Sequence, residues 1–252
     1  MSLCEFYPNN VAKNYLIEAD LDSFQQLWKL KTDWFEEPNI RRGGWSGVVK
    51  YSLNSTDDEL VVFIKRQENH ITRTLFHPIK GIATFQKEFH NIQRLNDKHI
   101  PTLELIYFGQ REQQAILITK SLEGYVSLDS ESISQMSRHQ KQSLLTKIAD
   151  TTRLMHHYHF QHNCFYPKHI FVKKINDQWD VRFIDLEKLK RTIFHRQAVI
   201  RDLFTLYRHA DQNWTTKDRL YFFKAYVNET KLSHQSKQLW QAIANKFQAK
   251  HK

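Results

Sequence analysis

The first half of the chain shows strand-like hydrophobic runs around one helical pattern. Residues 45–53 and 59–66 are β-prone and are separated by a polar turn cluster, which predicts a hairpin. Apolar residues recur at helical spacing over residues 84–96, and two more apolar runs follow at 103–108 and 115–119. The predicted order is therefore strand, strand, helix, strand, strand.

The pattern of the second half predicts mainly helices. Residues 140–158 place their apolar side chains on one helix face that is wide enough to be largely buried. Strands at 170–175 and 179–184 should form a hairpin, because the residues between them, Asn-Asp-Gln, favour a turn. Three further helices are predicted around residues 197–209, 217–227 and 235–248.

This asymmetry predicts an α+β fold with a small β-rich N-lobe and a larger α-helical C-lobe. No internal repeat, low-complexity tract or Gly/Ser linker interrupts the chain, so residues 1–252 should form a single two-lobed domain. We place the N-lobe at about residues 1–119, a hinge at about 120–127 and the C-lobe at about 128–252.

Composition narrows the class of protein. Hydrophobic residues make up 40% of the chain, and no stretch approaches the roughly 18 apolar residues of a membrane span, so a water-soluble protein is expected. The first residues lack the basic and apolar regions of a secretory signal, which favours a cytoplasmic location. Cys4 and Cys164 lie far apart in sequence and should both remain thiols in a reducing compartment.

The formal net charge of +10 favours an anionic partner, such as a phosphate-rich small molecule or an acidic lipid surface. Lys and Arg are scattered along the chain instead of being gathered in one tract. No nucleic acid partner is therefore expected.

Glycines gather in the segment RRGGWSG. Gly43, Gly44 and Gly47 are half of the six glycines in the chain. Such glycines let main-chain N–H groups approach the phosphates of a nucleotide. Their spacing differs from the G-x-G-x-x-G of protein kinases, and a simple turn is the alternative explanation.

Lys65 and Glu88 are a candidate ion pair. Lys65 ends the apolar run VVFIK, where alternation places it on the face that we expect the lobe to bury. Glu88 falls inside the apolar stripe of the 84–96 helix, where a carboxylate needs a partner. In kinases a strand lysine pairs with a helix glutamate and holds the α- and β-phosphates of ATP. The alternative is a Glu88 side chain that reaches water.

A second candidate group lies around the predicted C-terminal hairpin. His162, Cys164 and His169 match the kinase catalytic-loop spacing H-x-D-x-x-x-x-N, with Cys in place of Asp and His in place of Asn. Asp185 follows the second strand of the hairpin, a position that suits a magnesium ligand.

These motifs resemble the lipopolysaccharide kinase family. The segments RRGGWSG, IKRQENH, HPIKGIATFQKEF, HNCFYPKHIFV and FIDLEK are similar to its InaA branch, which is related to the WaaP core-heptose kinases, over roughly residues 40–225. The resemblance implies a protein-kinase-like fold, ATP with Mg²⁺, and the sugar-phosphate chemistry of the bacterial envelope. By position it carries over Lys65, Glu88, His169 and Asp185, the last two as magnesium ligands.

The general base differs from that of the WaaP-like enzymes, which have an aspartate where this chain has Cys164. A thiol accepts a proton from a sugar hydroxyl poorly, and it is too soft a ligand for magnesium. His162 is a candidate substitute base.

Two hypotheses follow from the resemblance. The first is an ATP-dependent kinase of a sugar hydroxyl, expected to be an inner-core heptose of lipopolysaccharide. Its acceptor would be an anionic glycolipid or sugar, reached by peripheral contact with the cytoplasmic face of the inner membrane. The second is a pseudokinase that acts as a regulatory or stress-response binding module.

Other residues admit further interpretations. Four histidines of the run MHHYHFQH could bind zinc from one helix face, or could simply favour a helix C-terminus: His156, His157, His159 and His162. Cys164 beside a histidine could be a nucleophile. Asp202 is expected to cap the start of a helix, although the equivalent residue of kinase-like folds also supports the catalytic loop.

Overall fold

The computed structural model describes residues 3–41, 43–55, 58–74, 77–210 and 214–248. The chain divides into two compact units. The N-terminal unit comprises Met1–Gln93 and Leu103–Glu123, and the C-terminal unit comprises Arg94–Thr102 and Gly124–Lys252.

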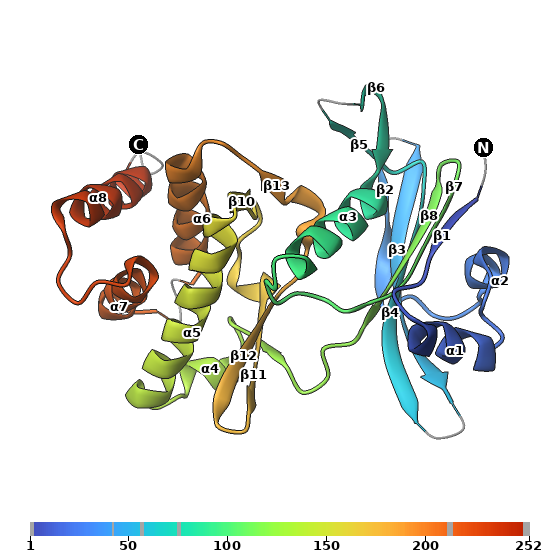
Figure 1. Ribbon diagram of the computed structural model, residues 1–252, viewed down its shortest axis with the longest axis horizontal. Helices are drawn as coiled ribbons and strands as arrows, with labels where there is room; N and C mark the ends of the chain where they lie inside the picture. The colour runs from blue at the N-terminus through green and yellow to red at the C-terminus, as the bar shows by residue number, and fades with distance from the viewer. Residues whose placement is uncertain (1–2, 42, 56–57, 75–76, 211–213, 249–252) are drawn as a thin grey trace. The chain divides into compact units, whose positions relative to one another are not determined.

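The N-terminal unit is built on an antiparallel sheet, which within the described residues has the strand order β1-β7-β8-β4-β3-β2 (Figure 1). Its strands are β1 (Cys4–Phe6), β2 (Glu36–Arg41), β3 (Gly44–Asn54), β4 (Glu59–Glu68), β7 (Leu105–Arg111) and β8 (Gln114–Lys120). A separate hairpin of β5 (Ile71–Thr74) and β6 (His77–Ala83) leads into α3 (Thr84–Asn96). Helices α1 (Asn10–Glu18) and α2 (Phe24–Lys29) lie on the other side of the sheet from α3 (Figure 1).

The main core of this unit lies between the sheet and the helices α1 and α2. Leu16 and Leu27 of these helices belong to one buried cluster with Val62 and Ile64 of β4. Lys65 alternates with the buried residues of β4, so its side chain leaves the sheet on the opposite face, where α3 lies. Lys65 therefore lies on the face that α3 covers, where its side chain is 18% exposed. The run VVFIK is apolar on both faces because helices cover both, so alternation alone could not choose between them.

A buried arginine holds the end of α2 against the sheet. Arg66 of β4 donates hydrogen bonds to the main-chain oxygens of Trp28 (2.9 Å) and Leu30 (2.8 Å), and its guanidinium stacks on the ring of Trp34. Burial lowers the pKa of Arg66. The carbonyl oxygens at a helix C-terminus carry partial negative charge, which explains why this cation is tolerated inside the unit.

The C-terminal unit is mainly helical. Its helices are α4 (Glu131–Ser134), α5 (Arg138–His157), α6 (His195–His209), α7 (Thr216–Val227) and α8 (His234–Gln248). Its short strands are β9 (Val126–Ser127), β10 (Phe160–Gln161), β11 (Ile170–Ile175), β12 (Gln178–Phe183) and β13 (Lys190–Arg191). In the β11–β12 hairpin, Ile175 pairs with Gln178 across a turn whose two residues, Asn176 and Asp177, have positive φ. Asn and Asp tolerate this conformation best among residues with a side chain.

The predicted elements are confirmed within a few residues of their boundaries. They are the two hairpins, the 84–96 helix, the strands before the hinge and the four long C-terminal helices. Residues 56 and 57 of the first predicted turn lie outside the described residues. The sequence analysis missed β1, α1, α2, β2 and the β5–β6 hairpin.

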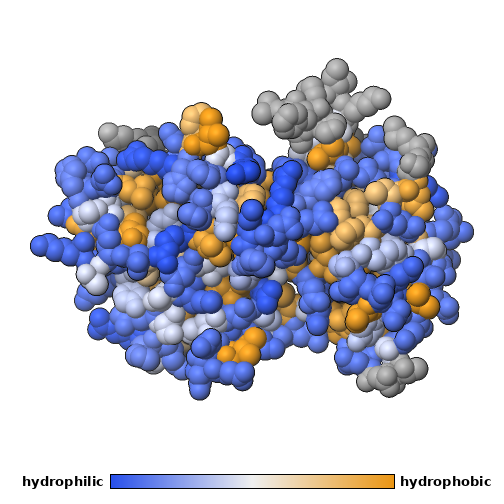
Figure 2. Space-filling view, viewed as in Figure 1, coloured by the Kyte–Doolittle hydropathy of each residue, from blue (hydrophilic) through white to orange (hydrophobic). Residues whose placement is uncertain are grey.

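Hydrophilic residues dominate the surface visible in Figure 2, and hydrophobic residues appear there in small groups. Among the described helices, none has the length and apolar composition needed to cross a membrane.

Candidate active site

The predicted ion pair of the N-terminal unit is present. Lys65 Nζ lies 2.7 Å from Glu88 Oε1, which joins the central strand β4 to helix α3. The Glu88 side chain is only 3% exposed, so the alternative in which it reaches water is wrong. The Lys65 side chain is 18% exposed and retains access to a ligand. A buried carboxylate thus holds an ammonium group at the surface of the sheet that faces α3.

The glycines of the RRGGWSG segment have packing and turn requirements of their own. Gly43 lies in the turn between β2 and β3 with φ +77°, a conformation that disfavours a side chain. A Cβ on Gly44 would lie 2.4 Å from the main chain of Asn69, and one on Gly47 would lie 2.5 Å from the Trp34 ring. A turn and close packing therefore account for these glycines without a phosphate.

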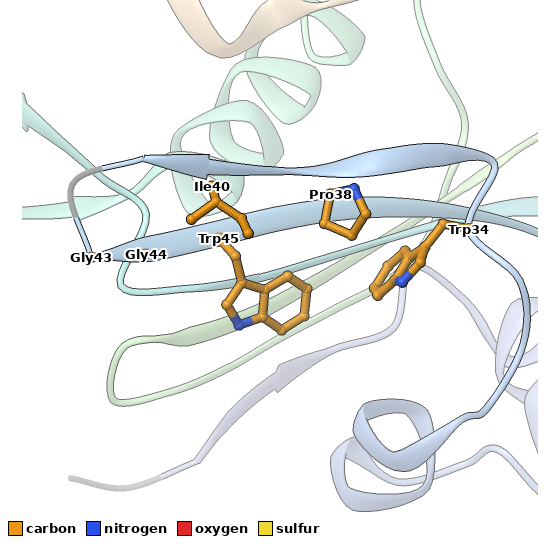
Figure 3. Close-up of a pocket in the computed structure, with 6 residues that line it drawn as sticks. All are labelled: Trp34, Pro38, Ile40, Gly43, Gly44 and Trp45. Atoms are coloured by element: carbon orange, nitrogen blue, oxygen red, sulfur yellow. The ribbon is translucent and has the colours of Figure 1, made fainter.

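A shallow pocket of about 430 Å³ lies beside this turn (Figure 3). Its lining residues are Trp34, Pro38, Ile40, Gly43, Gly44 and Trp45. Trp45 pairs with Glu68 across the sheet, whereas Val48 pairs with Lys65, and these two pairs fall on opposite faces because side chains alternate along a strand. The pocket is therefore not part of the Lys65 site.

Asp185 and His169 come together in the C-terminal unit. His169 Nδ1 lies 2.9 Å from the main-chain oxygen of Cys164, to which it donates, and 3.3 Å from Asp185 Oδ2. Asp185 has a left-handed backbone conformation, with φ 57° and ψ 58°, which is uncommon for a residue with a side chain. Its carboxylate is 33% exposed. The strained end of the hairpin thus presents an accessible carboxylate that an imidazole orients.

His162 has a structural position. Its Nε2 lies 3.0 Å from the main-chain oxygen of Ile184, and its Nδ1 accepts a hydrogen bond from the Cys164 N–H at 3.3 Å. Since a carbonyl oxygen can only accept, Nε2 carries the proton and both ring nitrogens are occupied. The ring is fully buried, and burial lowers the pKa of His162. The geometry therefore contradicts the interpretation of His162 as a substitute base: it holds the loop to the hairpin.

Cys164 is buried, and its thiol is not activated. Burial, followed by the nearby Asp185 carboxylate, raises the pKa of the Cys164 thiol. At neutral pH the side chain is therefore a neutral thiol. This protonation state argues against a nucleophilic cysteine and leaves no strong base at this position.

Asp202 supports the loop from within α6, so the prediction that it caps a helix start is wrong. Its carboxylate accepts hydrogen bonds from the N–H groups of His162 (2.7 Å) and Asn163 (3.0 Å). It also accepts one from His156 Nε2 at 3.2 Å, and Tyr226 donates to the other ring nitrogen of His156 at 2.9 Å. The alternative role, support of the loop, matches this geometry. The sequence analysis missed Tyr226, because only the packing of α7 against α5 reveals it.

The histidine run does not form a metal site. Both ring nitrogens of His156 and of His162 have protein partners. No cluster of three or more His, Cys, Asp or Glu side chains suited to a metal ion occurs in the part of the chain that the structure describes.

Phosphoryl transfer requires a cation that holds the phosphates and an oxygen ligand for magnesium, and this chain has a candidate for each. Lys65 offers a cation held by a buried carboxylate, and Asp185 offers a hard oxygen ligand of the kind that magnesium prefers. Because the transition state is loose, positioning and charge stabilisation account for most of the catalysis in this class of reaction.

Comparisons with known proteins agree with this chemistry. Protein InaA of Escherichia coli (strain K12) is 28% identical over 204 residues, which cover 77% of this chain and 91% of that protein. The lipopolysaccharide core heptose(I) kinase WaaP of Escherichia coli (strain K12) is 24% identical over 226 residues, which cover 81% of each.

Solved structures confirm the kinase-like α+β fold. A structure of WaaP in complex with acyl carrier protein matches with a TM-score of 0.68 and 20% identity, covering 98% of both chains. An aminoglycoside-3'-phosphotransferase of type VIII matches with a TM-score of 0.51 and 12% identity, covering 84% of this chain and 92% of that one. The model of the lipopolysaccharide kinase (Kdo/WaaP) family matches residues 25–226, most of the chain. This chain therefore belongs to the lipopolysaccharide kinase (Kdo/WaaP) family.

Proposed function

We propose that this chain is an ATP-dependent phosphotransferase that acts on a sugar hydroxyl, with an inner-core heptose of lipopolysaccharide as its acceptor. Family membership supports a kinase, and the similarity to the core heptose(I) kinase WaaP supports the acceptor. The observation that carries the proposal is the ion pair of Lys65 with the buried Glu88. A cation held by a buried carboxylate is the arrangement that a kinase uses to bind the α- and β-phosphates.

In this proposal Lys65 holds the phosphates and Glu88 orients Lys65. Asp185 binds magnesium, since an exposed carboxylate suits a hard cation. His169, proposed from sequence as a second ligand, has its Nδ1 engaged with Cys164 and Asp185, so we assign it the orientation of Asp185. The chemistry that a bound magnesium ion supplies is neutralisation of charge on the transferred phosphoryl group.

The net charge of the chain and its family membership support the proposed acceptor. The net charge of +10 supports an anionic glycolipid or sugar, with peripheral contact at the cytoplasmic face of the inner membrane. With Cys164 as a neutral thiol, the sugar hydroxyl receives no general-base help, which is typically worth about 10²–10⁴-fold in rate. We therefore expect slow phosphoryl transfer.

Binding of Mg-ATP should raise the melting temperature of the protein, and the Asp185→Asn substitution should remove this shift. At about a hundredfold excess of ligand over its Kd, binding adds about 2.7 kcal/mol to the free energy of unfolding, which is worth a few degrees. Thermal unfolding should be measured with ATP, with and without magnesium. Asp177→Asn is the matched control, because that carboxylate is 95% exposed in the β11–β12 turn. The absence of a magnesium-dependent shift at millimolar ATP would contradict the proposal.

The second candidate function is a pseudokinase that acts as a binding module, and the buried neutral thiol of Cys164 favours it. If only the base is missing, Cys164→Asp should raise the rate of phosphate transfer by about 10²–10⁴-fold. Transfer from radiolabelled ATP to dephosphorylated core lipopolysaccharide measures this rate, with Cys164→Ser as the control and a melting curve for each variant. A folded Cys164→Asp protein that binds Mg-ATP but transfers nothing would favour the binding module.

A further inference from the structure

A second pocket lies wholly within the C-terminal unit, among helices α5, α6, α7 and α8. Its volume is about 580 Å³. The lining residues that carry the argument are Arg153, His157, His195, Arg196, Tyr226 and Ser236. None of them has a role in the proposed phosphoryl transfer.

The charged groups of this pocket suit an anion. Arg153 of α5 and Arg196 of α6 carry guanidinium groups, which stay charged and match the geometry of a phosphate. Within the described residues, Arg196 makes no hydrogen bond or ion pair. Arg153 pairs with Asp150 at 2.8 Å, but these side chains are 41% and 48% exposed, so the pair contributes little and can give way to a ligand.

Glu229 also lines the pocket, but its charge is already accommodated. Its carboxylate accepts hydrogen bonds from the Ser233 N–H (2.7 Å) and from the hydroxyl groups of Ser233 and Ser236 (3.0 Å each). Ser233 directly precedes α8 and Ser236 lies in its first turn, where the helix dipole favours an anion. Glu229 therefore leaves the two guanidinium groups available.

The pocket is connected to the loop that carries Cys164. Tyr226, which lines the pocket, donates a hydrogen bond to His156, and His156 donates to Asp202. Asp202 in turn holds the N–H groups of His162 and Asn163. Tyr226, His156 and Asp202 are all buried, so this chain of hydrogen bonds is shielded from water and links a ligand at Tyr226 directly to the loop.

We propose that this pocket binds a phosphate group and that its occupancy alters the order of the loop at residues 162–163. Binding of the phosphate group does not depend on phosphoryl transfer. Regulation of catalysis through the loop at residues 162–163 rests on the proposed function. The phosphate group is carried either by a small soluble molecule or by a lipid headgroup.

Binding is tested in the Lys65→Met background, so that the nucleotide site does not contribute. Inorganic pyrophosphate is titrated calorimetrically, and vesicles of phosphatidylglycerol or of phosphatidylcholine are tested by co-sedimentation. Arg196→Ala should weaken binding by about tenfold or more, the loss of one charge-assisted hydrogen bond. Arg201→Ala is the control and should leave binding unchanged, because Arg201 is exposed on the same helix and does not line the pocket.

The outcomes distinguish the two sources of the phosphate group. Pyrophosphate binding identifies a soluble ligand, and binding to phosphatidylglycerol vesicles alone identifies a lipid headgroup. Equal binding by Arg196→Ala and Arg201→Ala, or no binding in either arm, overturns the proposal.

The connection to the loop is tested by hydrogen exchange at the amides of His162 and Asn163. The bound ligand should slow this exchange in the parent protein. Tyr226→Phe should keep the ligand affinity and lose the change in exchange, because it removes only the hydroxyl group that reaches His156. Exchange that does not respond to the ligand, or that responds equally in Tyr226→Phe, contradicts the coupling even where the pocket binds phosphate.

Discussion

Replacing Lys65 by methionine should reduce phosphate transfer by about 10²–10³-fold, the loss that follows removal of one group that stabilises the transition state. Methionine keeps the length of the side chain and its packing near Phe85 but removes the cation. It also leaves the buried Glu88 carboxylate without its partner, so the free energy of unfolding should fall by about 3 kcal/mol. This loss is at the low end of the range for breaking a buried ion pair, because Lys65 is partly exposed.

The double variant Lys65→Met/Glu88→Gln separates these two effects. A neutral amide in place of the buried carboxylate should recover most of the stability, measured by urea denaturation, but none of the activity. Glu88→Gln alone should retain more activity than Lys65→Met, because the ammonium group remains while its orientation is lost. Activity that returned together with stability in the double variant would show that Lys65 has only a structural role.

Replacing Asp202 by alanine should lower the free energy of unfolding by about 3–5 kcal/mol. The fully buried carboxylate accepts hydrogen bonds from the N–H groups of His162 and Asn163 and from His156. Its loss leaves the buried donors of His162 and His156 and the half-buried N–H of Asn163 without an acceptor. Each buried donor costs about 1–3 kcal/mol, offset in part by relaxation of the loop. Urea denaturation measures the change.

Asp150→Ala is the matched control for Asp202→Ala. Asp150 is an exposed carboxylate on α5 that pairs with Arg153, so its removal should change the free energy of unfolding by less than about 1 kcal/mol. Asparagine at position 202 should recover only part of the stability, since its amide has one acceptor oxygen for three donors. A small loss in Asp202→Ala, similar to that of Asp150→Ala, would show that water replaces the carboxylate.

Local patterns predicted the regular elements well. The α3 helix begins and ends where its apolar spacing indicated, and the β11–β12 hairpin turns at Asn176 and Asp177. The apolar spacing of this helix also singled out Glu88, because a carboxylate inside an apolar stripe needs a partner. The missed elements α1 and α2 are short helices whose stability comes from the core they share with the sheet, which no local window contains.

The sequence by itself determined the family and the order of the main elements, and it singled out Lys65, Glu88 and Asp185 as candidate site residues. Only the tertiary structure decided which face of β4 carries Lys65, that Gly47 accommodates the Trp34 ring, and that Asp202 supports a loop 39 residues away from it at Asn163. The physical reason is that periodicity reports whether a side chain is buried. The identity of its neighbour depends on how elements that are distant in sequence pack together.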